Sequence, residues 1–263
     1  MAATSFHVRS NSLPSRPHPL VSEVEENICR LRSSQAASTT SSISDNLRKL
    51  QDLHDSVDKL FQLPLNLQDH KFLNQLLDGS LRLLDLCNTA KDSLSQMKES
   101  VCELQSVLRR KQGDLDQSDV KHYLTKRKGV KKSIQKAMKN VKSIQSKSND
   151  NPEIVAVFRD VEATTINVFE SLASFVSVSR PSGWSFVSKL KHQKKVANEQ
   201  EMNEFTTVDA SLEALPGDKT NKCDEVQTQL QDLELLIQDL EEGTECLYRR
   251  MIKSRVSLLN IFN

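Results

Sequence analysis

The chain contains six histidines and five cysteines, the side chains that most often bind metal ions or act as nucleophiles. Two histidines four residues apart on one helix, or a C-x-x-C pair, would be typical of a zinc site, and the sequence has neither. The cysteines are far apart and odd in number, which is typical of a reducing compartment and does not favour a disulfide framework. We therefore expect no metal and no other cofactor.

Motifs that carry catalytic chemistry are also missing. The sequence has no G-x-G-x-x-G, no G-x-x-x-x-G-K and no G-x-S-x-G. Isolated Ser, Asp and Lys residues do not define an active site without a fold to bring them together. We therefore expect that the protein is not an enzyme.

A candidate phosphorylation site lies near the N-terminus, where residues 9–14 have the form R-S-x-S-x-P. A 14-3-3-type protein recognises this pattern when the second serine, Ser12, is phosphorylated, and Arg9 and Pro14 are the other defining residues. The surrounding Pro-rich segment would be accessible to a kinase. A chance match in a serine-rich tail is the alternative interpretation.

A basic stretch lies between Val120 and Asn149, where ten Lys or Arg residues occur without one acid. Apolar residues recur there at helical spacing, which predicts one amphipathic helix over residues 120–147 with most lysines opposite its apolar side. The candidate basic face consists of Lys128, Lys131, Lys132, Lys136, Lys139 and Lys142.

This basic face has three interpretations: pairing with acids of the same chain or simple solvation, binding to anionic lipid, and binding to nucleic acid. Only Tyr123 could stack on a base, which does not favour nucleic acid. The apolar side is Val, Ile, Ala and Met rather than the bulky residues of membrane-binding helices. We favour internal pairing or a solvated face, with anionic lipid as the second interpretation.

The elements that position these residues are clearest at the C-terminus. Apolar residues recur at alternating steps of four and three from Val226 to Ile261, interrupted only by Thr244 and Ser254. This heptad spacing predicts a long helix packed lengthwise against a partner. Eight acids precede Tyr248 on this helix, and four cations follow it. The heptad seam consists of Leu230, Leu233, Ile237, Leu240, Leu247, Met251 and Leu258.

Composition predicts an all-α fold, because Gly and Pro number only six and seven and aromatic residues are 5%. We expect an elongated antiparallel bundle of about five to seven helices, with a coiled-coil-like C-terminal helix, in one domain over residues 45–263. Loops are predicted near residues 112–119, 148–152, 179–183 and 213–223. Residues 1–44 are predicted to be a disordered Pro/Ser-rich segment with a short helix at 23–32.

Targeting signals are weak. No run of about 18 apolar residues occurs, so we expect no membrane span. The N-terminus lacks the apolar stretch of a signal peptide, and Ala2 stands where N-myristoylation requires glycine. The first acid is Glu23, as in transit peptides, but Pro14 and Pro17 oppose the helix that such peptides form. We expect a cytoplasmic protein, with peripheral membrane association as the alternative.

Several stretches resemble a large family of land-plant proteins that is distantly related to the BYPASS proteins. These stretches are HVRSNSLPSR at residues 7–16, LDGSLRLLDLC at 77–87, LQSVLRR at 104–110 and RVSLLNI at 255–261. The resemblance covers nearly the whole chain. It implies a helical cytosolic domain without known enzymatic activity and, for the BYPASS relatives, a role in root and shoot development.

Together these observations predict a non-enzymatic regulatory or scaffold protein of plant development that acts through helical contacts with other proteins. The alternative is a peripheral membrane adaptor that uses the basic helix. The sequence indicates neither the identity of the partner nor the oligomeric state.

Overall fold

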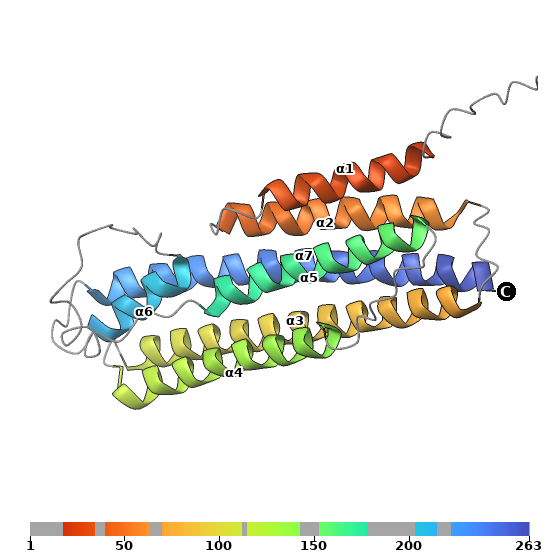
Figure 1. Cartoon of the computed structure of the whole chain (residues 1–263). Helices are drawn as coiled ribbons and strands as arrows, with labels where there is room; N and C mark the ends of the chain where they lie inside the picture. The colour runs from red at the N-terminus through yellow and green to blue at the C-terminus, as the bar shows by residue number, and fades with distance from the viewer. Residues whose placement is uncertain are drawn as a thin grey trace, which may run out of the picture.

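The computed structural model describes residues 18–34, 40–63, 70–111, 115–142, 153–177, 203–214 and 222–262. Within these ranges the chain forms helices and no strand, in one elongated bundle (Figure 1), which confirms the predicted all-α class. The helices are α1 (Pro19–Ser34), α2 (Thr40–Phe61), α3 (His70–Arg110), α4 (Gln117–Lys142), α5 (Glu153–Ser177), α6 (Glu204–Ala214) and α7 (Lys222–Phe262).

Helices α3 and α7 form the long axis of the bundle. Each has 41 residues, which corresponds to roughly 60 Å at about 1.5 Å per residue. They run antiparallel, side by side, and share the most extensive contacts of any two helices (Figure 1). The long C-terminal heptad helix predicted from the sequence is therefore present, and its partner helices are α3 and α2.

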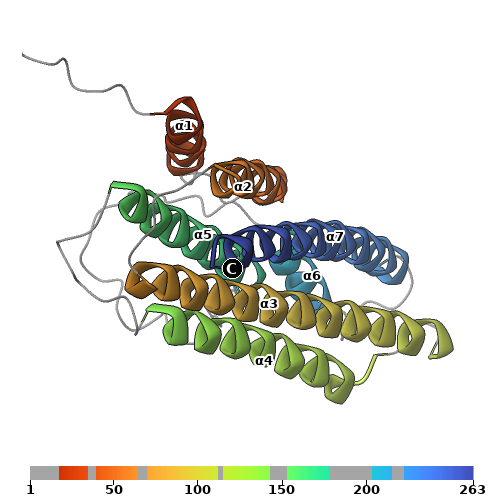
Figure 2. The same cartoon turned by 90° about the vertical axis from the view of Figure 1, so that its right-hand side faces the viewer.

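The remaining helices cover this central pair on different sides. Figures 1 and 2 both place α4 on the outer side of α3, with α7 on the opposite side of α3. Helix α2 packs on α7, and α1 packs on α2 and α5. Helix α5 contacts α1, α2, α3 and α4. None of the helices in the described ranges has an apolar run long enough to cross a membrane.

The N-terminal part of the bundle differs from the sequence prediction. Helix α1 extends beyond the expected short helix at 23–32, and α2 begins at Thr40, inside the segment at 1–44 that we predicted to be otherwise disordered. Helix α1 is packed rather than isolated, because Val24 and Leu31 have no exposed surface. Apolar residues at helical spacing outweigh the high serine content here. Residues 1–17 and 35–39 lie outside the described residues.

Helix α3 continues without a break through Gly79. The atoms nearest to a Cβ atom at Gly79 would belong to the Arg82 and Glu162 side chains, at 3.6 Å, so the closest neighbours of this glycine are polar. The predicted loops near 148–152 and 179–183 lie outside the described residues. Helix α6 was not predicted.

Candidate binding site

The basic face lies on α4, the outermost helix beside α3 (Figure 2). Lys128, Lys132, Lys136 and Lys139 are exposed, and Lys131 is half-buried. None of these five lysines forms an ion pair with a residue that the structure describes. The side chain of Lys142, the sixth residue of the face, lies outside the described part of the chain.

The predicted pairing between this face and the acids of α7 is wrong for the described residues. Glu241 of α7 pairs with Lys98 of α3 at 2.8 Å, and Glu245 pairs with Lys91 of α3 at 3.1 Å. Both carboxylates thus pair with lysines of α3 rather than with lysines of α4. The physical reason is position, because α3 lies between α4 and α7 (Figure 2). We had named a solvent-exposed face as the alternative to pairing, and the exposure of the lysines of α4 agrees with that alternative.

The heptad seam of α7 lies in the core. All seven predicted residues are buried: Leu230, Leu233, Ile237, Leu240, Leu247, Met251 and Leu258. The two polar residues that interrupt the series are buried as well and have hydrogen bonds. The Thr244 hydroxyl donates to the carbonyl of Leu240 at 2.7 Å, and the Ser254 hydroxyl donates to the carbonyl of His54 at 3.3 Å. The seam is therefore structural.

The candidate phosphorylation site, which consists of Ser12 with Arg9 and Pro14, lies outside the described residues. Its interpretation rests on the sequence pattern alone.

Among the cations of α4 whose side chains the structure describes, Arg127 is the buried one. The Arg127 guanidinium pairs with Asp209 of α6, donates to the carbonyl of Val176 at 3.0 Å and lies 5.0 Å from the ring centroid of Phe205. Burial raises the pKa of Asp209, and the nearby guanidinium opposes that rise. Arg127 therefore joins α4, α5 and α6, a role that its position within a run of cations did not reveal.

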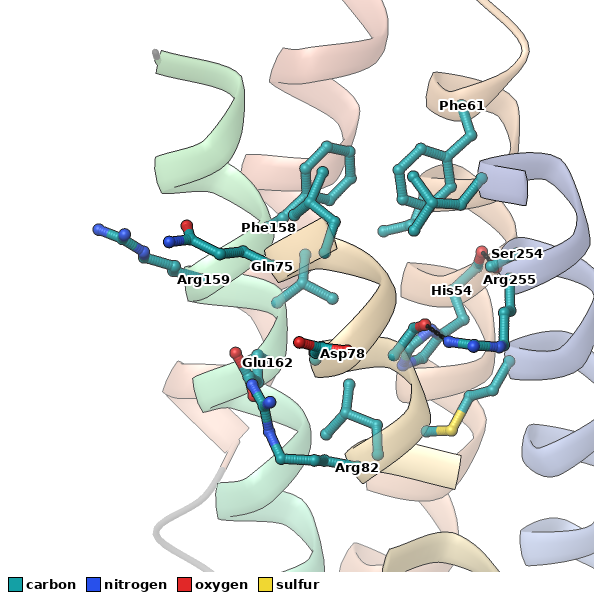
Figure 3. Close-up of a pocket in the computed structure, with 18 of the residues that line it drawn as sticks. His54, Phe61, Gln75, Asp78, Arg82, Phe158, Arg159, Glu162, Ser254 and Arg255 are labelled. Carbon is teal, nitrogen blue, oxygen red and sulfur yellow. Dashed lines mark hydrogen bonds and ion pairs between the residues drawn. The ribbon is translucent and has the colours of Figure 1, made fainter. Parts of the chain in front are cut away.

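A cavity of about 580 Å³ lies between four helices, α2, α3, α5 and α7 (Figure 3). The rings of Phe61 and Phe158 stack with centroids 4.5 Å apart in its wall. Sequence reasoning did not predict this cavity. Its apolar lining includes Val57, Phe61, Leu83, Phe158, Met251 and Leu258.

Three arginines line this cavity, and Figure 3 shows the side chain of Arg159 pointing away from the other two, Arg82 and Arg255. Arg82 pairs with Glu162 at 3.3 Å, and its Nε atom is buried without a hydrogen-bond partner. Arg255 donates to the Ser80 hydroxyl at 2.6 Å and to the carbonyl of Leu77. In Figure 3 Arg82 and Glu162 lie on the side of α5, and Arg255 approaches from α7. The cavity thus combines an apolar wall with two guanidinium groups from different helices.

His54 also lines the cavity and is buried. Burial lowers the pKa of its imidazole to about 4, so the ring is neutral near pH 7. Its Nε2 atom lies 3.2 Å from the Thr165 hydroxyl oxygen, and that hydroxyl already donates to the carbonyl of Val161 at 2.8 Å. Nε2 therefore carries the proton and donates to Thr165.

The described residues offer no candidate metal site. Within the described ranges His, Cys, Asp and Glu nowhere gather in a group of three or more that could hold a metal ion. The cavity and the basic face both have features suited to a ligand.

The family model described as Protein BPS1 matches residues 46–261. This range begins in α2 and ends in α7, so it includes the cavity, the basic face and the heptad seam. No curated protein and no solved structure matches the chain.

Proposed function

We propose that this chain, which belongs to the BPS1 protein family, is a plant developmental regulator that works as a non-enzymatic scaffold of root and shoot development. The family match, which agrees with the resemblance to BYPASS-related proteins, supports the developmental role. The scaffold mechanism is supported by an apolar surface on α7.

This surface consists of Ile252, Val256 and Leu259, which are 41%, 51% and 38% exposed. Their spacing of four and then three residues places them on one face of α7. The seam residues Met251 and Leu258, in the same helical turns, are buried and lie on a different face of the helix. Contiguous exposed apolar surface is typical of a protein-protein contact, and this stripe is the observation that carries the proposal.

Affinity purification from plant tissue followed by mass spectrometry tests this surface. The variant Ile252→Ser/Val256→Ser/Leu259→Ser is expected to lose the partners that the parent protein retains, without a large change in stability. The matched control is Leu235→Ser, which changes another exposed apolar residue of α7, 63% exposed and about 30 Å along the helix from Val256. Equal partner sets for the parent and the triple variant would contradict the scaffold mechanism.

A second candidate function is that of a peripheral membrane adaptor. It is favoured by the five lysines of α4 that lack an ionic partner in the described chain, because such a face can bind anionic head groups. Liposome flotation tests it, with anionic and neutral vesicles compared at two salt concentrations. The adaptor predicts flotation with anionic vesicles only, and loss of flotation for Lys132→Glu/Lys136→Glu/Lys139→Glu. A scaffold that ignores lipid charge predicts no flotation with either.

We also propose a 14-3-3-type partner at phosphorylated Ser12, supported by the arrangement of Arg9 and Pro14 around it. A synthetic peptide of residues 6–19 should bind a 14-3-3 protein more tightly when Ser12 is phosphorylated. Equal affinity of the two peptides would end this part of the proposal. The proposed location is the cytoplasm, supported by five cysteines that are all free thiols.

A further inference from the structure

The cavity between α2, α3, α5 and α7 is large enough to hold a small molecule. Its volume of about 580 Å³ lies within the range of roughly 300 to 1,000 Å³ that is usual for ligand sites. The stacked rings of Phe61 and Phe158 give it a flat apolar wall. Such a wall accepts the apolar body of a ligand, so the charged residues decide which polar group the ligand carries.

Arg255 is a cation of the cavity that has no ion-pair partner among the residues that the structure describes. The three cations that directly precede it in the last turns of α7 each pair with a carboxylate: Arg249 with Glu245 at 3.0 Å, Arg250 with Asp55 at 2.9 Å and Lys253 with Asp58 at 2.9 Å. Arg255 instead donates from Nη1 to the neutral oxygens of Ser80 and Leu77. Its charge therefore remains available to an anion in the cavity.

Arg82 contributes a second donor. Its Nη2 atom is occupied by Glu162, but its Nε atom is buried and has no hydrogen-bond partner. A buried N–H group without a partner costs free energy, and an acceptor on a ligand would remove that cost.

The acids that line the cavity do not cancel the preference of the two arginines for an anion. Glu162 is paired with Arg82, and Asp160 is paired with Arg32 of α1 at 3.1 Å. Asp78, which lies between the two arginines in Figure 3, is exposed, so water screens its charge more strongly than that of a half-buried group.

We propose that this cavity binds a small, mostly apolar molecule that carries one carboxylate, with its apolar body against Phe61 and Phe158 and its carboxylate on Arg255. The inference is independent of the scaffold proposal, because it uses the interior of the bundle rather than its surface.

Isothermal titration of the full chain with two matched probes tests the proposal. The probes are naphthoate and naphthamide, which have the same ring system and differ in the negative charge. Naphthoate is expected to bind at least about tenfold more tightly, because a charge-assisted hydrogen bond is roughly twice as strong as a neutral one. Equal affinities for the two probes, or no saturable binding of either, would overturn the proposal without any variant.

Variants then locate the site. Arg255→Met should reduce the affinity for naphthoate to that for naphthamide, whereas Arg249→Met removes the same charge from an exposed position and should change neither affinity. Asp78→Asn should bind naphthoate at least as tightly as the parent. Unchanged naphthoate binding by Arg255→Met, or weaker binding by Asp78→Asn, would show that the carboxylate does not lie where we place it.

A steric pair completes the design. Gly79→Leu adds a side chain to the cavity wall and should abolish binding of both probes, whereas Gly79→Ala adds a Cβ atom at ordinary contact distance and should bind as the parent does. Thermal melts monitor folding of each variant. Retained binding by a folded Gly79→Leu protein would place the probes outside this cavity.

Discussion

His54 couples the stability of the core to pH. Burial lowers the pKa of its imidazole to about 4, whereas an unfolded histidine titrates near about 6.5. Between these values the unfolded chain binds a proton that the folded chain does not, so the free energy of unfolding falls as the pH decreases through this range.

We predict that the protein loses roughly 2 kcal/mol of stability from His54 alone between pH 6.5 and pH 5. Urea unfolding at intermediate pH values measures it. The variant His54→Gln, which cannot take up a proton but keeps an N–H donor for Thr165, should show a flatter dependence on pH in this interval. Identical slopes for the parent and the variant would mean that the imidazole is accessible to protons in the folded state.

Arg127 and Asp209 form a buried ion pair between α4 and α6. We predict that Arg127→Met costs about 3 to 5 kcal/mol, because it leaves the Asp209 carboxylate buried without its counter-ion. The double variant Arg127→Met/Asp209→Leu should recover most of this loss, since neither buried charge remains. A double-mutant cycle in denaturant measures the coupling. If the destabilisation of the double variant equals the sum of those of the two single variants, the two side chains do not interact in solution.

At the scale of elements, α4 and α7 carry opposite charges without meeting. The acids of α7 reach the lysines of α3, and the lysines of α4 point into solvent on the far side of α3. Proximity in space, rather than matching charge along the sequence, thus decides which helices exchange ion pairs.

We predict that reversing Lys131, Lys132, Lys136 and Lys139 to Glu changes the free energy of unfolding by no more than about 0.5 kcal/mol. The reason is that these lysines have no ion pair to lose among the described residues. In the matched variant Lys91→Glu/Lys98→Glu on α3, the free energy of unfolding should fall by about 0.2 to 1 kcal/mol for each ion pair. This loss of stability should be smaller at high salt. Thermal melts at two ionic strengths compare the two variants. A large, salt-dependent loss of stability in the α4 variant would indicate that acidic groups lie close to these lysines in solution.

At the scale of the whole molecule, the C-terminal half of α7 contributes buried side chains and an ion pair that hold the bundle together. Met251 and Leu258 are buried in the core, and Lys253 neutralises Asp58, whose side chain is 4% exposed. These residues connect α7 to α2 and to the cavity end of α3.

We predict that deleting the residues after Leu247 prevents cooperative unfolding. The loss of two buried apolar side chains costs about 1.5 to 3 kcal/mol each, and Asp58 is left buried without its cation. This total approaches the stability of roughly 5 to 15 kcal/mol that is usual for a domain. Circular dichroism melts of the truncated and full chains measure it. Unchanged helicity per residue with an unchanged melting temperature would show that this half of α7 is dispensable for folding.

The sequence by itself determined the helical class, the length of α7 and the buried face of that helix. Each of these depends on the hydrophobic period within one segment, which can be recognised without knowing what that segment packs against. The heptad spacing identified the seven seam residues correctly as a single face, including the positions around Thr244 and Ser254. It did not reveal that these two hydroxyls satisfy their hydrogen bonds within the core.

Only the tertiary structure decided which faces meet. The short helix α6 was missed because its eleven residues carry little periodic signal, and with it the partner of Arg127 was missed. The cavity brings together residues as far apart as His54, Arg82 and Arg255, from helices whose order along the chain does not indicate their order in space. Charge and hydrophobic period are local properties of a helix. The choice of neighbour depends on long-range packing, in which every helix competes for the same buried surface.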